Sequence, residues 1–360
     1  MYLAILGREP ELSIAELEAL FGEVKKVTSQ LALFDADAMP SIDRLGGTLK
    51  LAEKLNEKPL DFLMKAPEGK ITLGVSDYSK GASKKSASLE AMKLKKILTR
   101  QGRSVRAVMG DAAVLATATS LHNGLSGKNP RKIELIKVNS DWYRVIGVQD
   151  IDAYSRRDQG RPARDAKVGM LPPKLAQILI NLCGPLPEKS VILDPFCGTG
   201  VVLQEALLMG YKAYGTDISE RMVEYSRRNL EYFKFSNFEL EVGDATNHQW
   251  PKVDAVACEG YLGKPMNKIP SEMELKEQKQ ECAGIILGFL KNLSGQIKQD
   301  TPVVMGIPAW LREDSTYSRL EILDQIKDMG YNVNNKSLGG LLYFRDGQIV
   351  ARDIIILRKD

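Results

Sequence analysis

The most informative segment of the chain is VILDPFCGTG, residues 191–200. An apolar run leads into Asp194, and a turn that carries Gly198 and Gly200 follows it. Glycines in such a turn let the backbone approach a ligand, and a helix that starts there offers free N–H groups. The third glycine of a dinucleotide fingerprint is missing, because residues 201–203 are Val-Val-Leu. The loop therefore favours a nucleoside ligand without a pyrophosphate.

Apolar strands alternate with helices from residue 171 onward, which is typical of a doubly wound, mostly parallel α/β sheet. Pro172-Pro173 begins a helix expected over 174–182. The sequence predicts strands at 191–193, 213–216, 238–242, 253–258 and 303–307. The last two strands, 341–344 and 351–357, are joined across Asp346-Gly347, a turn that favours a hairpin. An antiparallel strand is therefore expected to close the sheet.

Two further acids end the next predicted strands. Asp217 lies 23 residues after Asp194, where a carboxylate accepts hydrogen bonds from ribose hydroxyls, and Asp244 is placed to accept from an adenine amino group. Either acid alone is more simply an N-cap. In this order on successive strand ends they predict a nucleoside site, formed by Asp194, Pro195, Phe196, Cys197, Gly198, Thr199, Gly200, Asp217, Ile218, Asp244 and Ala245.

Charge divides the chain unevenly. Its 360 residues carry a net charge of +4, but residues 69–168 hold 20 basic against 9 acidic side chains. A basic block beside a slightly acidic one indicates that one part holds a polyanion. A solvated lysine-rich surface explains the same count, so charge alone leaves both interpretations open.

The residues before 171 fall into three segments. Residues 1–65 predict a small α+β unit whose first helix has Ser13 as N-cap and Glu16 as its capping-box partner. Residues 66–150 predict a second α+β unit with a basic helix over 87–100 and a hairpin across residues 139–141. Residues 151–170 are an arginine-rich connector that is hard to bury, and a domain boundary is expected there.

Cysteine and histidine usage argues against metal or disulfide chemistry. The four cysteines form no C-x-x-C pair, and with two histidines a zinc site is not expected. No signal peptide or run of 18 apolar residues is visible, so the sequence predicts a cytoplasmic protein without a membrane partner.

The motifs resemble a known family. DPFCGTG followed by GTDIS and GDA is similar to RNA methyltransferases with the class I, Rossmann-like fold that binds S-adenosylmethionine. The connector YSRRDQGRPARDAKVGMLPPKLAQILINL and the opening LGREPELSIAELEALF resemble the THUMP-containing tRNA guanosine N2-methyltransferases that act on guanosine 10. The resemblance implies S-adenosylmethionine as cofactor and tRNA as partner. It also implies a ferredoxin-like domain at 1–65, a THUMP domain at 66–150, a linker at 151–170 and a methyltransferase domain at 171–360.

One departure from that family concerns the catalytic segment. The family's fourth strand ends in an acid or amide, two prolines and an aromatic, followed by glycine, whereas this chain has Glu259-Gly260-Tyr261-Leu262-Gly263. Aligned without gaps, Glu259 takes the place of the acid, and Tyr261 lies one position early. We expect Glu259, Gly260 and Tyr261 to form the catalytic segment. A carboxylate there accepts hydrogen bonds from the guanine amino group while an aromatic ring stacks on the base, and no metal is needed.

Basic side chains before the methyltransferase domain are the expected RNA contacts. They are Lys84, Lys85, Lys95, Lys96, Arg100, Arg156, Arg157, Arg161 and Arg164. Three alternatives stay open: amino methylation of another RNA or DNA base, covalent pyrimidine methylation through Cys258, and an inactive RNA-binding protein that retains the cofactor. The sequence also leaves open whether a small activator subunit is required.

Overall fold

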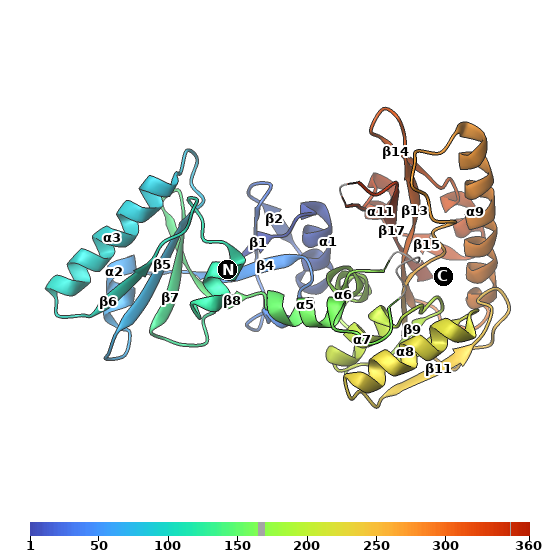
Figure 1. Cartoon of the computed structure of the whole chain (residues 1–360), viewed down its shortest axis with the longest axis horizontal. Coiled ribbons are helices and arrows are strands. Elements are labelled where there is room, and N and C mark those ends of the chain that lie inside the picture. Colours follow the sequence, from blue (N-terminus) through green and yellow to red (C-terminus); the bar gives the residue numbers. More distant parts are fainter. Residues whose placement is uncertain (165–169, 346) are drawn as a thin grey trace. The chain divides into compact units, whose positions relative to one another are not determined.

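The computed structural model describes residues 1–164, 170–345 and 347–360 (Figure 1). The chain forms two compact units, Met1–Tyr154 and Ser155–Asp360. The boundary falls inside the segment 151–170, in helix α5 (Ile151–Gln159). Asp346 of the predicted hairpin turn and residues 165–169 of the connector lie outside the described residues.

The N-terminal unit is built on one eight-stranded sheet with the order β2-β3-β1-β4-β8-β7-β5-β6. Its strands are β1 (Tyr2–Leu6), β2 (Val24–Lys26), β3 (Leu31–Phe34), β4 (Thr48–Lys54), β5 (Ile71–Asp77), β6 (Val105–Val108), β7 (Lys132–Val138) and β8 (Asp141–Val148). Its helices are α1 (Pro10–Phe21), η1 (Ile42–Arg44), α2 (Pro59–Met64), α3 (Lys84–Arg100) and α4 (Thr117–His122). The predicted hairpin of β7 and β8 is present, with Asn139 in the left-handed region at φ 55°.

The segments 1–65 and 66–150 share this sheet, because β4 pairs with β8. They are also joined by a buried ion pair. Lys50 of β4 donates to Glu134 of β7 at 2.6 Å, and the same ammonium reaches the hydroxyl of Ser120 at 2.7 Å. A buried charge is tolerated only when it is paired in this way. The division into ferredoxin-like and THUMP domains stays a prediction.

The predicted start of the first helix was wrong. Helix α1 begins at Pro10, so Ser13 and Glu16 lie inside it and are buried. The Ser13 hydroxyl donates to the carbonyl oxygen of Gly47, and the Glu16 carboxylate accepts from the N–H groups of Gly46 and Gly47. The polar pair therefore fixes a distant loop instead of capping the helix.

The C-terminal unit contains the predicted doubly wound sheet, with the order β11-β10-β9-β12-β13-β17-β15. Its strands are β9 (Val191–Asp194), β10 (Lys212–Asp217), β11 (Phe238–Val242), β12 (Ala255–Glu259), β13 (Pro302–Leu311), β14 (Tyr317–Arg319), β15 (Tyr331–Val333), β16 (Leu342–Tyr343) and β17 (Val350–Lys359). Strands β9 to β13 run parallel, and β17 pairs antiparallel with β13. The antiparallel closing strand is confirmed, and β16 pairs with it as a short hairpin partner.

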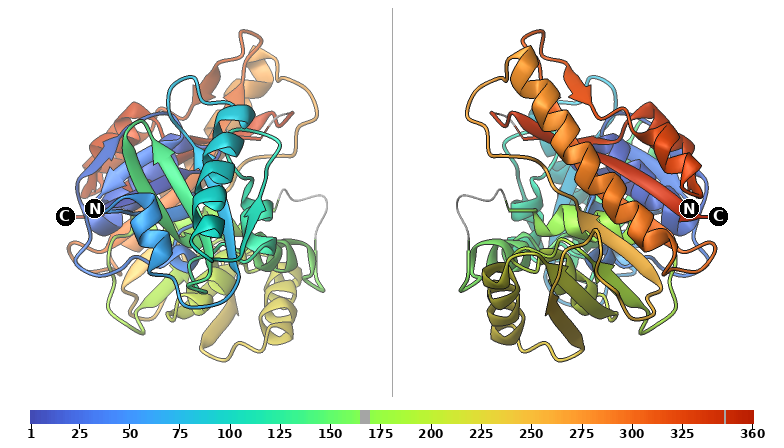
Figure 2. Two further views of the ribbon diagram at one scale, coloured as in Figure 1. Left: turned by 90° about the vertical axis from the view of Figure 1, so that its left-hand side faces the viewer. Right: turned by 90° about the vertical axis from the view of Figure 1, so that its right-hand side faces the viewer.

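Helices cover both faces of this sheet. One face carries α6 (Pro173–Leu182), α7 (Val201–Leu208) and α8 (Glu220–Tyr232). The other face carries α9 (Glu272–Ser294), seen lying across the strands in Figure 2, and α10 (Leu323–Asp328). A short helix, α11 (Asn335–Gly339), precedes β16. Apolar residues of α9, among them Phe289 and Leu290, form the core with β12 and β13. The parallel strands therefore present their carboxyl ends at one edge, where ligands bind in such sheets.

Candidate active site

The glycine loop follows β9 as the sequence predicted. Asp194 is buried at the end of β9, and its Oδ1 accepts from the N–H of Phe196 at 3.1 Å. Gly200 takes φ 81° and stands as the residue before helix α7, while Gly198 takes φ 49°. Both angles lie in the left-handed region that favours glycine. A side chain at Gly198 would meet only one atom within 4 Å, so the space above the loop is open.

Asp217 ties this loop to β10. Its Oδ2 accepts from the N–H of Gly198 at 3.0 Å, and its Oδ1 accepts from the N–H of Ser219 at 2.9 Å. Burial raises the pKa of Asp217, and these two N–H groups oppose that rise. Burial raises the pKa of Asp194 well above its usual range, and the charges of Asp217 and Glu259 add to this effect. The charges of Asp217 and Glu259 thus both act on Asp194, at one edge of the sheet.

Side chains of helix α8 hold the glycine loop by hydrogen bonds to its backbone. Ser226 donates from its hydroxyl to the carbonyl oxygen of Gly198 at 2.9 Å. Asn229 donates to the carbonyl oxygens of Thr199 and Ala163, both at 2.9 Å, and accepts from the N–H of Ala163. A Cβ at Gly200 would lie 2.8 Å from the Ser226 hydroxyl oxygen. Close packing against α8 therefore requires glycine at this position.

The third predicted acid follows β11. Asp244 accepts from the backbone N–H and the hydroxyl of Thr246 at 2.9 and 2.8 Å, and Ala245 behind it is buried. Two apolar side chains nearby are exposed: Ile218 by 73% and Val242 by 52%. Val242 is paired with Asp217 across β10 and β11. An apolar surface therefore adjoins the acids at the strand ends, as a purine ring requires.

Glu259 ends β12, the neighbour of β9. Gly260 donates from its N–H to the carbonyl oxygen of Gly306 at 2.9 Å, which holds the segment against β13. The Glu259 side chain is 17% exposed, and its Oε1 accepts from Nε of Arg352 at 2.7 Å. Burial raises the pKa of Glu259, and the Arg352 guanidinium lowers it again.

Tyr261 has a different environment. Its hydroxyl donates to Glu281 of α9 at 3.0 Å, and its ring packs against the apolar core. Burial, reinforced by Glu281, raises the pKa of this phenol to about 12. The ring contributes to packing against α9, so its predicted stacking role stays a prediction. Gly263 has φ 86°, and a Cβ there would come within 2.4 Å of Gln278.

This chain is similar to known methyltransferases in its family models, in its sequence and in its structure. A family model described as a methyltransferase domain matches residues 186–339, and one described as a DNA methylase matches residues 113–228. A tRNA (guanine(10)-N2)-dimethyltransferase of Pyrococcus abyssi is 29% identical over 259 residues, which are 68% of this chain and 71% of the relative. A protein of the same name from Methanocaldococcus jannaschii is 26% identical, over 66% of this chain and 72% of its own length. The crystal structure of TrmN from Thermus thermophilus is 18% identical with a TM-score of 0.50, and the match covers 100% of this chain and 99% of that one.

The C-terminal unit is a class I, S-adenosylmethionine-dependent methyltransferase domain. The predicted cofactor is thereby confirmed. In this methyltransferase the arrangement of hydrogen-bonding groups at the sheet edge fits a nucleoside that carries no pyrophosphate. The acids end three neighbouring strands, an open glycine loop lies beside them, and exposed Ile218 and Val242 offer an apolar surface. Asp217 would hold the ribose hydroxyls and Asp244 the adenine amino group.

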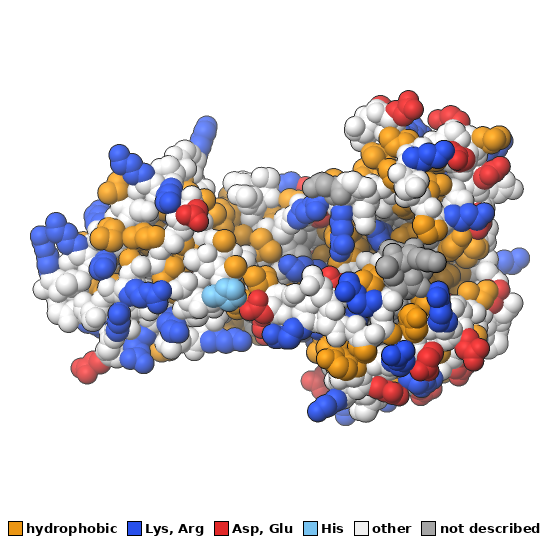
Figure 3. Space-filling model, in the orientation of Figure 1, with side chains coloured by type: hydrophobic (Ala, Val, Ile, Leu, Met, Phe, Trp, Pro, Cys, Tyr) orange, Lys and Arg blue, Asp and Glu red, His pale blue; other side chains and the backbone are white. Residues whose placement is uncertain are grey.

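Helix α3 of the methyltransferase presents most of the predicted RNA-binding lysines to solvent. Lys84, Lys85, Lys96 and Arg100 are exposed, and Lys95 is half-buried. Ser83 caps the helix through a hydrogen bond from Ser86, and the opposite face packs on the sheet through Ala91, Leu94 and Leu98. On the face shown in Figure 3, Lys and Arg side chains are spread over the N-terminal unit.

The four arginines of the connector divide into two groups. Arg156 and Arg164 are exposed, as an RNA contact requires. Arg157 makes two hydrogen bonds to the buried carboxylate of Glu205, at 2.8 and 3.2 Å. Arg161 is 3% exposed and donates to the Thr199 hydroxyl at 3.0 Å. The expectation that this connector is hard to bury was therefore wrong at Arg161, which supports the glycine loop.

The cysteines are all free and buried. Burial raises the pKa of Cys197 and Cys258 well above the usual range for a thiol. Because the thiolate is the nucleophile, neither environment suits covalent catalysis. None of the helices in the described part of the chain combines the length and the apolar character of a membrane span.

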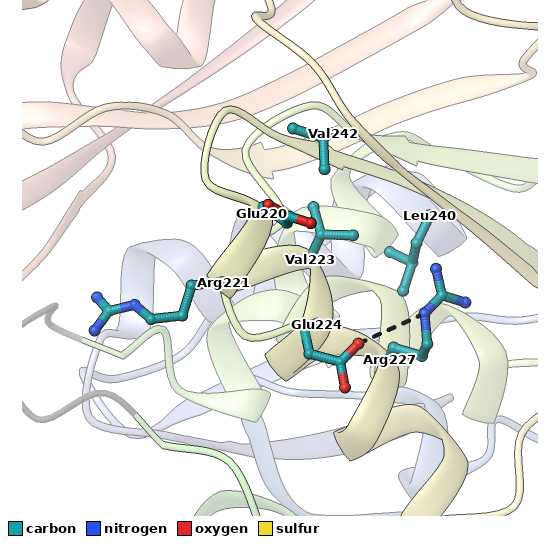
Figure 4. A pocket seen from close by; sticks show the side chains of 7 residues that line it. All are labelled: Glu220, Arg221, Val223, Glu224, Arg227, Leu240 and Val242. Carbon is teal, nitrogen blue, oxygen red and sulfur yellow. Dashed lines mark ion pairs between the residues drawn. The ribbon is translucent and has the colours of Figure 1, made fainter.

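A pocket between α8 and β11 borders the cofactor site without containing its acids (Figure 4). Val223, Leu240 and Val242 form its apolar part, and Glu224 pairs with Arg227 at its rim. The contact between Val242 and Asp217 links the pocket to the predicted cofactor site.

Sequence reasoning missed Arg352, Ser226 and Asn229. Arg352 interrupts an apolar strand, VARDIIIL, and a charge in such a strand signals a buried partner. Ser226 and Asn229 lie three residues apart on α8, so they share the face that meets the glycine loop. Their small polar side chains gave no signal that distinguished them from a solvated helix face.

Proposed function

We propose that the methyltransferase modifies the exocyclic N2 amino group of a guanosine in tRNA, at position 10. The names of the relatives from Pyrococcus abyssi and Methanocaldococcus jannaschii support this substrate, since both are tRNA (guanine(10)-N2)-dimethyltransferases. The feature of the site that carries it is the carboxylate of Glu259, which lies beside the cofactor acid Asp194 at the same sheet edge.

A carboxylate suits guanine for a chemical reason. Guanine places the N1–H and N2–H donors side by side, and each oxygen of a carboxylate has two lone pairs with which to accept. Adenine and cytosine carry a ring-nitrogen lone pair beside their amino group, which an ionised acid repels. Glu259 therefore favours guanine among the bases that carry an amino group.

S-adenosylmethionine supplies an electrophilic methyl group when it is bound. The N2 lone pair of guanine is delocalised into the ring, so the amino group must pyramidalise before it attacks. A hydrogen bond from N2–H to Glu259 favours that geometry, and the carboxylate accepts the proton that nitrogen loses. Fixed acceptors and alignment of this kind lower barriers without any covalent intermediate.

The N-terminal unit would hold the tRNA by its phosphates. Exposed Lys84, Lys85, Lys96 and Arg100 lie along or beside one helix, in the block where basic side chains outnumber acidic ones. Such contacts position an RNA without reading its sequence. A base in a stem must leave its stack to reach the sheet edge, as enzymes that modify bases require. The THUMP assignment of residues 66–150 belongs to this proposal.

A second candidate is amino methylation of a DNA base. The match of residues 113–228 to a model described as a DNA methylase supports it. A panel of acceptors separates the two: unmodified tRNA, single-stranded DNA and duplex DNA, each incubated with methyl-labelled cofactor. We expect label in tRNA alone. Label in DNA without label in tRNA would replace the first proposal by the second.

A further inference from the structure

Arg352 approaches the catalytic edge from a strand that carries no predicted site residue. It lies on β17, separated from β12 by β13. Its side chain is 4% exposed and crosses β13 to donate from Nε to Oε1 of Glu259 at 2.7 Å. Nη1 of the same guanidinium donates to Gln348 at 3.1 Å. An almost fully buried arginine is therefore directed at Glu259, the carboxylate that we propose to receive the substrate amino group.

A glycine leaves space for this side chain. Gly306 of β13 pairs with Glu259 on one side and with Ile354 of β17 on the other. A Cβ at Gly306 would lie 3.5 Å from Cβ and 3.6 Å from Cγ of Arg352, in ordinary contact. A branched side chain at Gly306 would extend into the space that the arginine occupies.

We propose that Arg352 is a positioning residue for methyl transfer: it fixes Oε1 of Glu259 and leaves Oε2 for the amino group of the substrate. This inference rests on the proposed function of Glu259. Among the described residues, Oε2 has no hydrogen-bond partner, whereas Oε1 is held by the guanidinium. Glutamate has one more rotatable bond than aspartate, so its carboxylate needs such a restraint to stay aligned.

The charges around Glu259 give the inference a pH signature. Arg352 and Arg345 act on it with positive charge, and Asp194 of β9 and the buried thiol of Cys258 in β12 are the further titratable groups that interact with it. Burial raises the pKa of Glu259, and Arg352 offsets this rise most strongly. Loss of Arg352 raises the pKa of Glu259, so the active ionised form then requires a higher pH.

The test compares Arg352→Gln with Arg358→Gln, which removes the same charge from the exposed end of the same strand. Methyl transfer to tRNA is measured under single-turnover conditions from acid to alkaline pH, with cofactor affinity measured calorimetrically. In Arg352→Gln we expect the rate at neutral pH to fall about tenfold or more. The acid limb should move up by about one pH unit, with cofactor affinity unchanged. Arg358→Gln should match the wild-type protein.

A second pair of variants applies if Arg352→Gln does not fold. Gly306→Val fills the space that the arginine uses, and Gly306→Ala adds only a Cβ at contact distance. We expect Gly306→Val to reproduce the displaced acid limb, and Gly306→Ala to displace it less because the arginine keeps its place. An active wild-type protein whose acid limb stays in place in both Arg352→Gln and Gly306→Val would overturn the inference. Absence of N2-methylguanosine with the wild-type protein would instead contradict the proposed function.

Discussion

Asn229 of α8 donates to the carbonyl oxygen of Thr199 at 2.9 Å and thereby fixes the glycine loop. The same carboxamide pairs with both backbone groups of Ala163, in the segment that precedes the methyltransferase sheet. Asn229 is fully buried, and each of these partners would lose its hydrogen bond if the side chain were removed. One side chain therefore connects the cofactor loop to the connector.

Replacement of this residue should weaken cofactor binding. Asn229→Ala leaves three backbone groups without a partner, and each buried loss costs about 1–3 kcal/mol. We expect affinity for S-adenosylmethionine to fall by about tenfold or more, together with the melting temperature. Calorimetric titration measures the first and a thermal scan the second. Asn332→Ala, at an exposed position, is the control. Equal affinity in the two variants would show that the loop does not depend on Asn229.

Asp217 should make cofactor binding depend on charge and pH. Asp217→Asn places an amide where two backbone N–H groups and the ribose hydroxyls need acceptors, so affinity should fall by about ten- to a hundredfold. Because burial raises the pKa of Asp217, the wild-type carboxylate is protonated at a higher pH than a free aspartate. Cofactor affinity should therefore weaken as pH falls through that raised pKa. A flat affinity profile across the acid range would contradict this role, and Asp324→Asn is the exposed control.

Glu259 should affect the methyl-transfer step and leave cofactor binding alone. Glu259→Gln keeps the size of the side chain and removes the ionised acceptor. We expect the single-turnover rate to fall by about a hundred- to a thousandfold, as for other preorganised transition-state contacts. Glu272→Gln on the exposed start of α9 should have no effect. A Glu259→Gln rate within threefold of wild type would remove Glu259 from the mechanism.

The lysines of α3 should control the salt dependence of tRNA binding. Lys85→Glu with Lys96→Glu reverses two exposed charges, and Lys276→Glu with Lys291→Glu makes the same change on α9. The α3 variant should bind tRNA more weakly at low salt and lower the slope of log affinity against log salt by about two. Fluorescence anisotropy at several salt concentrations measures both. If the α9 variant shows the same loss, only net charge matters and α3 is an ordinary solvated surface.

The cofactor half of the molecule was predictable from the sequence because short-range patterns encode it. Apolar runs mark β9 and β10, and Asp194 and Asp217 stand at their ends because parallel strands present carboxyl ends at one edge. The pairing of Glu259 with Arg352 joins residues 93 positions apart, and no local pattern records such a contact. The prediction of Ser13 as an N-cap was wrong for the same reason, because its hydrogen-bond partner, Gly47, is 34 residues away. Arg161 was expected in solvent on composition alone, but inside the fold its guanidinium donates to Thr199 and pairs with Asp158 at 3.7 Å.

The most direct measurement is methyl transfer from labelled S-adenosylmethionine to two unmodified tRNAs, one with guanosine and one with inosine at position 10, followed by nucleoside analysis. Inosine keeps the ring and N1–H of guanosine but lacks the N2 amino group. We predict N2-methylated guanosine from the first tRNA and no methylated nucleoside at position 10 from the second. Equal labelling of both tRNAs, or label in a nucleoside other than N2-methylated guanosine, would contradict guanosine 10 as the target.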